Sequence, residues 1–135
     1  MKTVCLLGLT LALGRSVLAD EMPQNRFDPE RFFRTYIGPI LERRCFECHS
    51  QDHKTKGGLA LDSKAGWELG GESGPAVHPG DLKGSLLVKA IRHLDEDSAM
   101  PPKEKLSVAE IALLETWVML GAPDPRTSAP QKSHP

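Results

Sequence analysis

The sequence predicts an all-α domain in which about three helices are joined by long, irregular loops. Three segments repeat apolar residues at helical spacing, whereas Leu59 and Leu61 are at most a short extended piece. The twelve Gly and eleven Pro indicate that much of the 135-residue chain is loop. Four Phe, two Trp and one Tyr are few large side chains for a core. Because loops this long usually enclose something, we expect a bulky apolar ligand at the centre.

The charge balance argues against two classes of partner. Seventeen Lys and Arg stand against eighteen Asp and Glu, for a net charge of −1 at pH 7. Binding to nucleic-acid phosphates relies on a basic surface, and binding to anionic lipid relies on a polybasic patch. We therefore expect no nucleic-acid partner. The length fits a single domain.

The first 19 residues have the three parts of a secretory signal peptide. Lys2 gives a positive start, residues 4–13 are almost wholly apolar, and Val17-Leu18-Ala19 forms a cleavage site before Asp20. The apolar stretch is well short of the ~20 residues that a membrane-spanning helix needs. We expect export to the periplasm or an equivalent extracytoplasmic space, with membrane attachment only if this segment stays uncleaved.

The mature chain is expected to contain a leader (20–29), one domain (30–124) and a disordered tail (125–135). Its first helix starts with an N-cap, Asp28, followed by Pro29. Gly38-Pro39 inside the apolar run predicts either a kink or a fresh start at Pro39. The apolar face expected on this helix comprises Phe32, Phe33, Tyr36, Ile37, Ile40, Leu41 and Cys45.

Two more helices are predicted after a mainly irregular stretch over residues 50–84. Ser85 can cap a short helix over residues 86–91. Ser107 and Glu110 form a capping box at the start of the clearest helix, and Gly121 can end that helix in a left-handed conformation. Its buried face is expected to comprise Ile111, Leu114, Trp117 and Val118.

The chemistry is concentrated in Cys45-Phe46-Glu47-Cys48-His49. Cys-x-x-Cys-His is the attachment motif of c-type haem. The two thiols lie about one turn apart, so each can form a thioether with a haem vinyl group, and His49 is directed to the iron as the proximal ligand. The predicted cofactor is therefore one covalent haem c with its iron. Export agrees with this prediction, because c-type haem is attached outside the cytoplasm.

A disulfide, a redox dithiol and a zinc site are the alternatives for these residues. Once Cys5 leaves with the signal peptide, an even pair of cysteines remains, and such a pair often forms a disulfide in an oxidising compartment. A thioredoxin-like dithiol needs a βαβ context, which the sequence does not show. A zinc site needs four ligands, and the other histidines form no second pair at ligand spacing. Those histidines are His53, His78, His93 and His134.

Met100 is the expected sixth ligand of the iron. It stands in Met100-Pro101-Pro102, where two prolines fix an extended segment that can hold a thioether over the far face of the haem. Three other side chains compete for this role. Met22 lies in the leader, and Met119 lies inside the last helix, where core packing is usual. His93 is the competing histidine, but the acidic run at residues 95–97 favours a solvated side chain there.

Several short motifs follow one another in order: Ile37-Gly38-Pro39-Ile40-Leu41, the cysteine motif, 56–62, 70–76, Pro79-Gly80-Asp81, Ser85-Leu86-Leu87, Met100-Pro101-Pro102, Lys105-Leu106-Ser107, Glu115-Thr116-Trp117 and Gly121-Ala122-Pro123. Together they resemble the planctomycete cytochrome C family over residues 32–126. The resemblance implies a fold like that of class I cytochrome c, wrapped around one haem, with Met100 as the distal ligand. In that family the domain is commonly fused to much larger extracellular domains.

These observations predict an exported monohaem c-type cytochrome that transfers single electrons. Cys45 and Cys48 would be the covalent anchors, and His49 and Met100 the axial ligands. With both axial positions filled, electron transfer is favoured over enzymatic chemistry. The expected partners are donor and acceptor proteins, with the chain a monomer or a subunit of a larger complex. The alternatives are a haem-based sensor or peroxidase-like enzyme with a displaceable sixth ligand, and a haem subunit docked to one larger extracellular enzyme.

Overall fold

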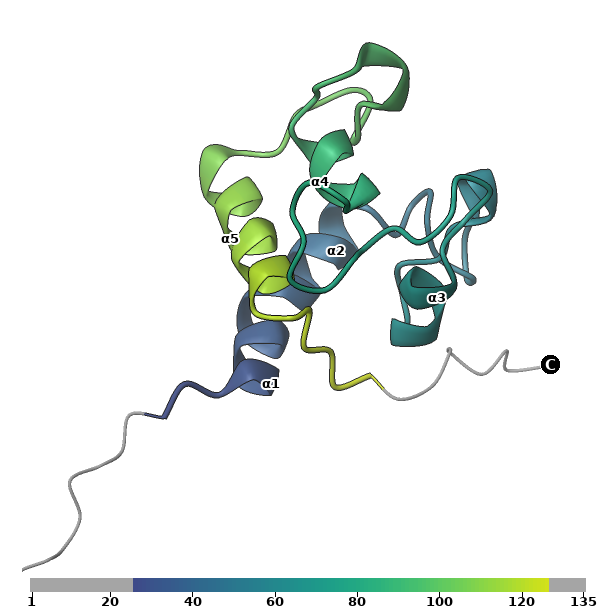
Figure 1. The fold of residues 1–135 in the computed structure, drawn as a ribbon. Coiled ribbons are helices and arrows are strands. Elements are labelled where there is room, and N and C mark those ends of the chain that lie inside the picture. The colour runs from purple at the N-terminus through teal and green to yellow at the C-terminus, as the bar shows by residue number, and fades with distance from the viewer. Residues whose placement is uncertain (1–25, 127–135) are drawn as a thin grey trace, which may run out of the picture.

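The structure, a computed structural model, describes residues 26–126 (Figure 1). Over these residues the chain is helical, and no strand forms beyond two isolated bridges. The predicted all-α class is therefore confirmed. The predicted signal peptide, the leader up to residue 25 and the tail from residue 127 lie outside the described residues. The elements are α1 (Pro29–Phe32), the π-helical η1 (Phe33–Ile37), α2 (Gly38–Arg44), the 3₁₀ turn η2 (Lys56–Gly58), α3 (Lys64–Leu69), α4 (Leu86–Ile91), the 3₁₀ turn η3 (Glu96–Ser98) and α5 (Val108–Met119).

The first three elements form one continuous helix with a π-helical turn before Pro39. Its start is the predicted one, because the Asp28 side chain accepts the backbone N–H of Arg31 at 3.0 Å. Pro39 has no N–H, and its ring would collide with the carbonyl four residues earlier in a regular α-helix. The wider turn, in which the N–H of Gly38 donates to the carbonyl of Phe33, accommodates the proline without ending the helix.

This π turn decides which apolar side chains reach the core. Phe33 and Ile37, four residues apart, are both buried. Tyr36, which was predicted on the same face, is 49% exposed, because the wider turn places it farther round the helix. Phe32 is only half-buried, and its ring lies 5.4 Å from that of Tyr36.

Helix α5 packs against η1 and carries the predicted capping box. Ser107 Oγ accepts the N–H of Glu110 at 3.1 Å, and Glu110 Oε2 accepts the N–H of Ser107 at 2.9 Å. Gly121 follows the helix with φ of 88°, as predicted. Met119, which was expected to pack in the core, lies on the outer side and is 59% exposed. The buried side chains of α5 are Leu114, Trp117 and Val118, with Ile111 half-buried.

Helix α3 lies within the stretch that the sequence predicted as mainly irregular. Ser63 caps it by accepting the N–H of Gly66 at 3.0 Å. Glycine lowers helix propensity, yet this position requires it, because a Cβ on Gly66 would lie 2.5 Å from the carbonyl oxygen of Ala60. Trp67 of α3 is buried and meets Trp117 edge-on, with 5.7 Å between the ring centroids. Figure 1 shows α3 on the side of α2 opposite α5.

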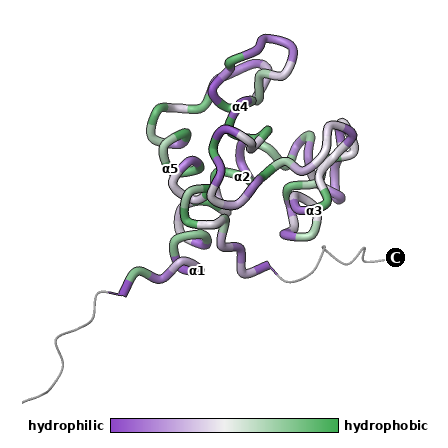
Figure 2. Tube along the Cα trace, viewed as in Figure 1, coloured by the Kyte–Doolittle hydropathy of each residue, from purple (hydrophilic) through white to green (hydrophobic). Residues whose placement is uncertain are grey.

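Helix α4 has the predicted position but not the predicted cap. The Ser85 side chain makes no capping bond. Its buried hydroxyl instead donates to the carbonyl of Asp81 at 2.7 Å and accepts the N–H of His78 at 2.9 Å, which fastens the preceding loop. The loop between α4 and α5 is mostly hydrophilic (Figure 2). Within residues 26–126, no helix is long and apolar enough to cross a membrane.

Candidate haem site

The cysteine motif forms a tight turn at the C-terminal end of α2. Cys45 is the C-cap residue, and its carbonyl accepts the N–H groups of Cys48 at 3.1 Å and His49 at 2.9 Å. This turn brings the two cysteines and the histidine together at one place on the surface of the fold. Both thiols are free and half-buried, so the structure has no disulfide between Cys45 and Cys48.

The imidazole of His49 is oriented by a backbone carbonyl. Its Nδ1 lies 3.4 Å from the carbonyl oxygen of Leu59. A histidine that donates from Nδ1 presents the lone pair of Nε2, which is the usual arrangement of a metal-binding histidine. Burial lowers the pKa of His49 despite the opposing hydrogen bonds from the backbone, and this favours the neutral form that a metal ligand must have. The N–H of Leu61 donates to the His49 carbonyl at 2.7 Å, which holds the next loop against the motif.

The Cys45 thiol differs from the nucleophilic thiol of a redox dithiol. Burial raises the pKa of the Cys45 thiol to about 12, although the charge of Arg44 opposes the shift. Disulfide oxidoreductases instead need a nucleophilic cysteine with a lowered pKa. In the part of the chain that the structure describes, no group of three or more His, Cys, Asp and Glu side chains could hold a metal ion. The motif residues fit covalent attachment of a haem best.

Met100 lies in the loop between α4 and α5, and this loop is closed at its base. The N–H of Met100 donates to the carbonyl of Ala90 in α4 at 3.0 Å. Farther along, Lys105 Nζ donates to the carbonyl of Arg92 at 2.9 Å. These two bonds hold both halves of the loop to the end of α4.

Arg44 joins the base of the Met100 loop to the cysteine motif. It precedes Cys45 directly, and its Nη2 donates to the carbonyl of Lys105 at 3.3 Å. Its Nη1 donates to Glu104 Oε2 at 3.4 Å, and its Nε lies 3.8 Å from Glu110 Oε1 at the start of α5. Arg44 therefore holds the Met100 loop at the end of α2 that carries the cysteine motif. Sequence patterns gave no sign of this role, because its partners are 60 residues or more away.

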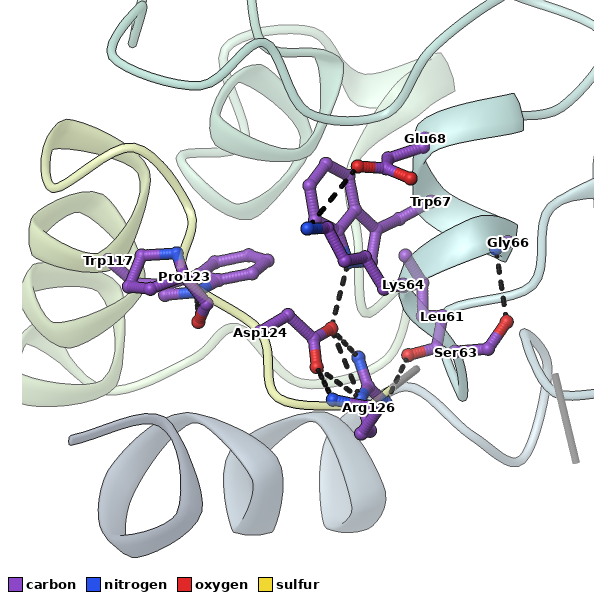
Figure 3. Close-up of polar contacts among 10 residues, drawn as sticks. All are labelled: Leu61, Ser63, Lys64, Gly66, Trp67, Glu68, Trp117, Pro123, Asp124 and Arg126. Carbon is purple, nitrogen blue, oxygen red and sulfur yellow. Dashed lines mark hydrogen bonds and ion pairs between the residues drawn. The ribbon is translucent and has the colours of Figure 1, made fainter. Parts of the chain in front are cut away.

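A second polar cluster, beside α3, fastens the C-terminal part of the described chain (Figure 3). The Asp124 side chain is 0% exposed; its Oδ2 accepts Trp67 Nε1 at 3.0 Å and Arg126 Nη2 at 2.6 Å. Arg126 also donates from Nη1 to the Leu61 carbonyl at 3.0 Å, and its guanidinium carbon lies 4.8 Å from the centre of the Phe33 ring. Arg126, assigned to the tail from sequence, thus makes specific contacts with the domain.

A comparison with known protein families adds to the evidence from the structure. The family model of planctomycete cytochrome C matches residues 45–104, a range that begins at Cys45 and includes His49 and Met100. Comparison with curated proteins and with solved structures gave no match. Members of a cytochrome c family carry haem c with its iron. The segment from Cys45 to Glu104 therefore matches the planctomycete cytochrome C family, and this match supports a c-type cytochrome domain there.

Proposed function

We propose that this protein is an exported monohaem c-type cytochrome that transfers single electrons between partner proteins. The turn after α2 carries the proposal, because it presents two free thiols beside a histidine whose Nδ1 faces a carbonyl. Cys45 and Cys48 would hold one haem covalently, and His49 and Met100 would occupy the axial positions of its iron. The haem supplies the electron chemistry when bound, and the chain sets its orientation and environment.

The chain's own residues keep this site closed to other chemistry. The carbonyl of Leu59 orients His49, and Arg44 holds the loop that carries Met100. With His49 and Met100 both bound, the haem would offer no free position to small molecules, so single-electron transfer would be favoured over oxygen or peroxide chemistry.

Absorption spectra of the protein, expressed with a periplasmic haem-maturation system, test this proposal. We expect one covalent haem per chain by mass, a mature N-terminus at Asp20, and a low-spin spectrum that does not change when CO is added to the reduced protein. A change with CO would instead favour the sensor or peroxidase-like alternative. Stable co-purification with one larger enzyme would favour a docked subunit.

Cysteine variants provide the matched control. The double variant Cys45→Ala/Cys48→Ala should lose all haem that resists denaturation, since both thioether bonds are gone. The variant Cys5→Ala should keep the full amount, because that cysteine lies in the predicted signal peptide. Retention of covalent haem by the double variant, or its absence from the wild type, would overturn the proposal.

Replacing Arg44 with Gln should loosen the Met100 loop without changing any proposed ligand. The variant loses the charge that holds Glu104 and Glu110, so we expect the free energy of unfolding to fall by about 1–2 kcal/mol. We also expect the absorption band that reports sulfur bound to the oxidised iron to weaken, because Met100 would leave the iron more often. Arg43→Gln, at the exposed neighbouring position, is the control. A band of equal strength in the two variants would contradict the role given to Arg44.

A further inference from the structure

His93 lies beside Met100 at the C-terminal end of α4. The N–H groups of His93 and Met100 both donate to the carbonyl oxygen of Ala90, at 3.1 and 3.0 Å. Two donors on one oxygen bring the two backbones side by side. The two residues that compete in sequence for the sixth position are thus neighbours in space.

The backbone of His93 is strained. Its φ is 56°, in the left-handed region that residues with a Cβ rarely adopt. The N–H of Leu94 donates to the carbonyl of Lys89 at 3.4 Å, so His93 is the residue after the C-cap in a Schellman motif. Glycine is the usual residue at that position. Helix termination alone therefore does not require a histidine here.

The side chain of His93 has a further unfavourable feature. Its Nε2 is buried and has no hydrogen-bond partner among residues 26–126, so the expectation of a solvated histidine is wrong for this atom. The acidic run does not supply a partner: Asp95 accepts the N–H of Asp97 and the hydroxyl of Ser98. A buried nitrogen without a partner has lost its hydrogen bonds to water and has gained none within the protein, which costs free energy. A bond to a metal would satisfy it, since imidazole nitrogen is the commonest metal ligand in proteins.

We propose that His93 is a second axial ligand, which binds the haem iron through Nε2 whenever Met100 does not. This inference rests on the proposed function. In the exchange, His93 Nε2 would take the place of the Met100 sulfur as a ligand, so one lone-pair donor would replace another and no electron would be transferred. The site would stay closed to small molecules with either ligand bound. The reduction potential of the haem would be lower with the His93 nitrogen than with the Met100 sulfur as the ligand.

Spectra of the reduced and oxidised holoprotein with Met100→Ala, alone and combined with His93→Gly, test the proposal. Glycine is the matched replacement, because it removes the imidazole and suits the left-handed backbone. Met100→Ala should stay low-spin and bind no CO. The double variant should become high-spin and bind CO, and added free imidazole should return it to low-spin. His93→Gly alone should keep the methionine-ligated spectrum and unfold at the same temperature as the wild type or a higher one.

The outcomes separate the two proposals. A Met100→Ala variant that is high-spin and binds CO would overturn the role of His93, while a low-spin haem in the wild type would leave the proposed function standing. A double variant that stays low-spin would also overturn it, because another group would then hold the position. Met100→Ala/His53→Ala, which removes an exposed histidine, should behave as Met100→Ala does. A wild type without covalent haem would overturn the proposed function itself.

Discussion

Replacing Met100 with alanine should lower the reduction potential of the haem by an amount on the order of 0.1 V or more, within the roughly 0.8 V that axial ligands span. A methionine sulfur raises the potential relative to a nitrogen ligand. With the sulfur removed, His93 is the neighbouring donor, since it shares the Ala90 carbonyl with Met100. A redox titration followed by absorbance measures the change, and the absorption band that reports sulfur bound to oxidised iron should disappear.

Met119→Ala is the matched control for this experiment. Met119 is 59% exposed on the outer side of α5, so its loss should leave both the potential and the spectrum unchanged. If Met100→Ala had the potential and the spectrum of the wild type, Met100 would not be an axial ligand. His93 would then become the first candidate for that position in the wild type.

Replacing Asp124 with alanine should reduce the free energy of unfolding by about 3–5 kcal/mol, because it removes one partner of a buried ion pair. The change leaves the indole N–H of Trp67 and the guanidinium of Arg126 without their shared acceptor. Denaturant unfolding followed by tryptophan fluorescence measures it. Asp97→Ala, at an exposed position, should change the stability little. Similar losses in the two variants would show that the buried cluster does not stabilise the fold.

The stabilisation by Asp124 should also depend on pH. Burial by itself raises the pKa of this carboxyl, but hydrogen bonds from Arg126 and Trp67 outweigh burial and bring the pKa below its usual range. The folded-state pKa is then lower than the unfolded-state value of about 3.9. The contribution is therefore fully present above the unfolded-state pKa and is lost as the pH falls through the folded-state pKa. The stability difference between wild type and Asp124→Asn should shrink with falling pH below about 4, and a constant difference would contradict this assignment.

The predictable parts of the fold were those set by neighbouring residues. Asp28 and the Ser107–Glu110 pair act within one helical turn, so their patterns identified the first and last helices. Helix α3 was missed because Gly66 argues locally against a helix, whereas the reason for that glycine is the distant backbone of Ala60. The cap predicted at Ser85 was wrong for a similar reason. The loop before α4, which local patterns do not describe, competes for the hydroxyl that would otherwise cap the helix.

The same distinction between local and distant contacts applies to the candidate site. The proposed attachment residues lie within five consecutive positions, so their spacing alone predicted the chemistry that we propose for them. The far side of the site depends on contacts between distant segments, such as those of Arg44 with Glu104 and Lys105. The surroundings of His93 depend on how α4 ends, and the acidic residues that follow it in sequence suggested exposure.

The π turn in the first helix lets the cysteine motif keep its direction although the helix holds one extra residue. Such a turn takes up one additional residue in an α-helix. Because successive α-helical residues are about 100° apart, the same sequence without the π turn would rotate everything after Ile37 by roughly that angle relative to the capped start at Asp28. Arg44 and Cys45 would then face another direction, and the contacts of Arg44 with the Met100 loop would be lost. The chain between Asp28 and Cys45 therefore has one residue more than a regular α-helix of the same orientation, and the π turn compensates for that residue.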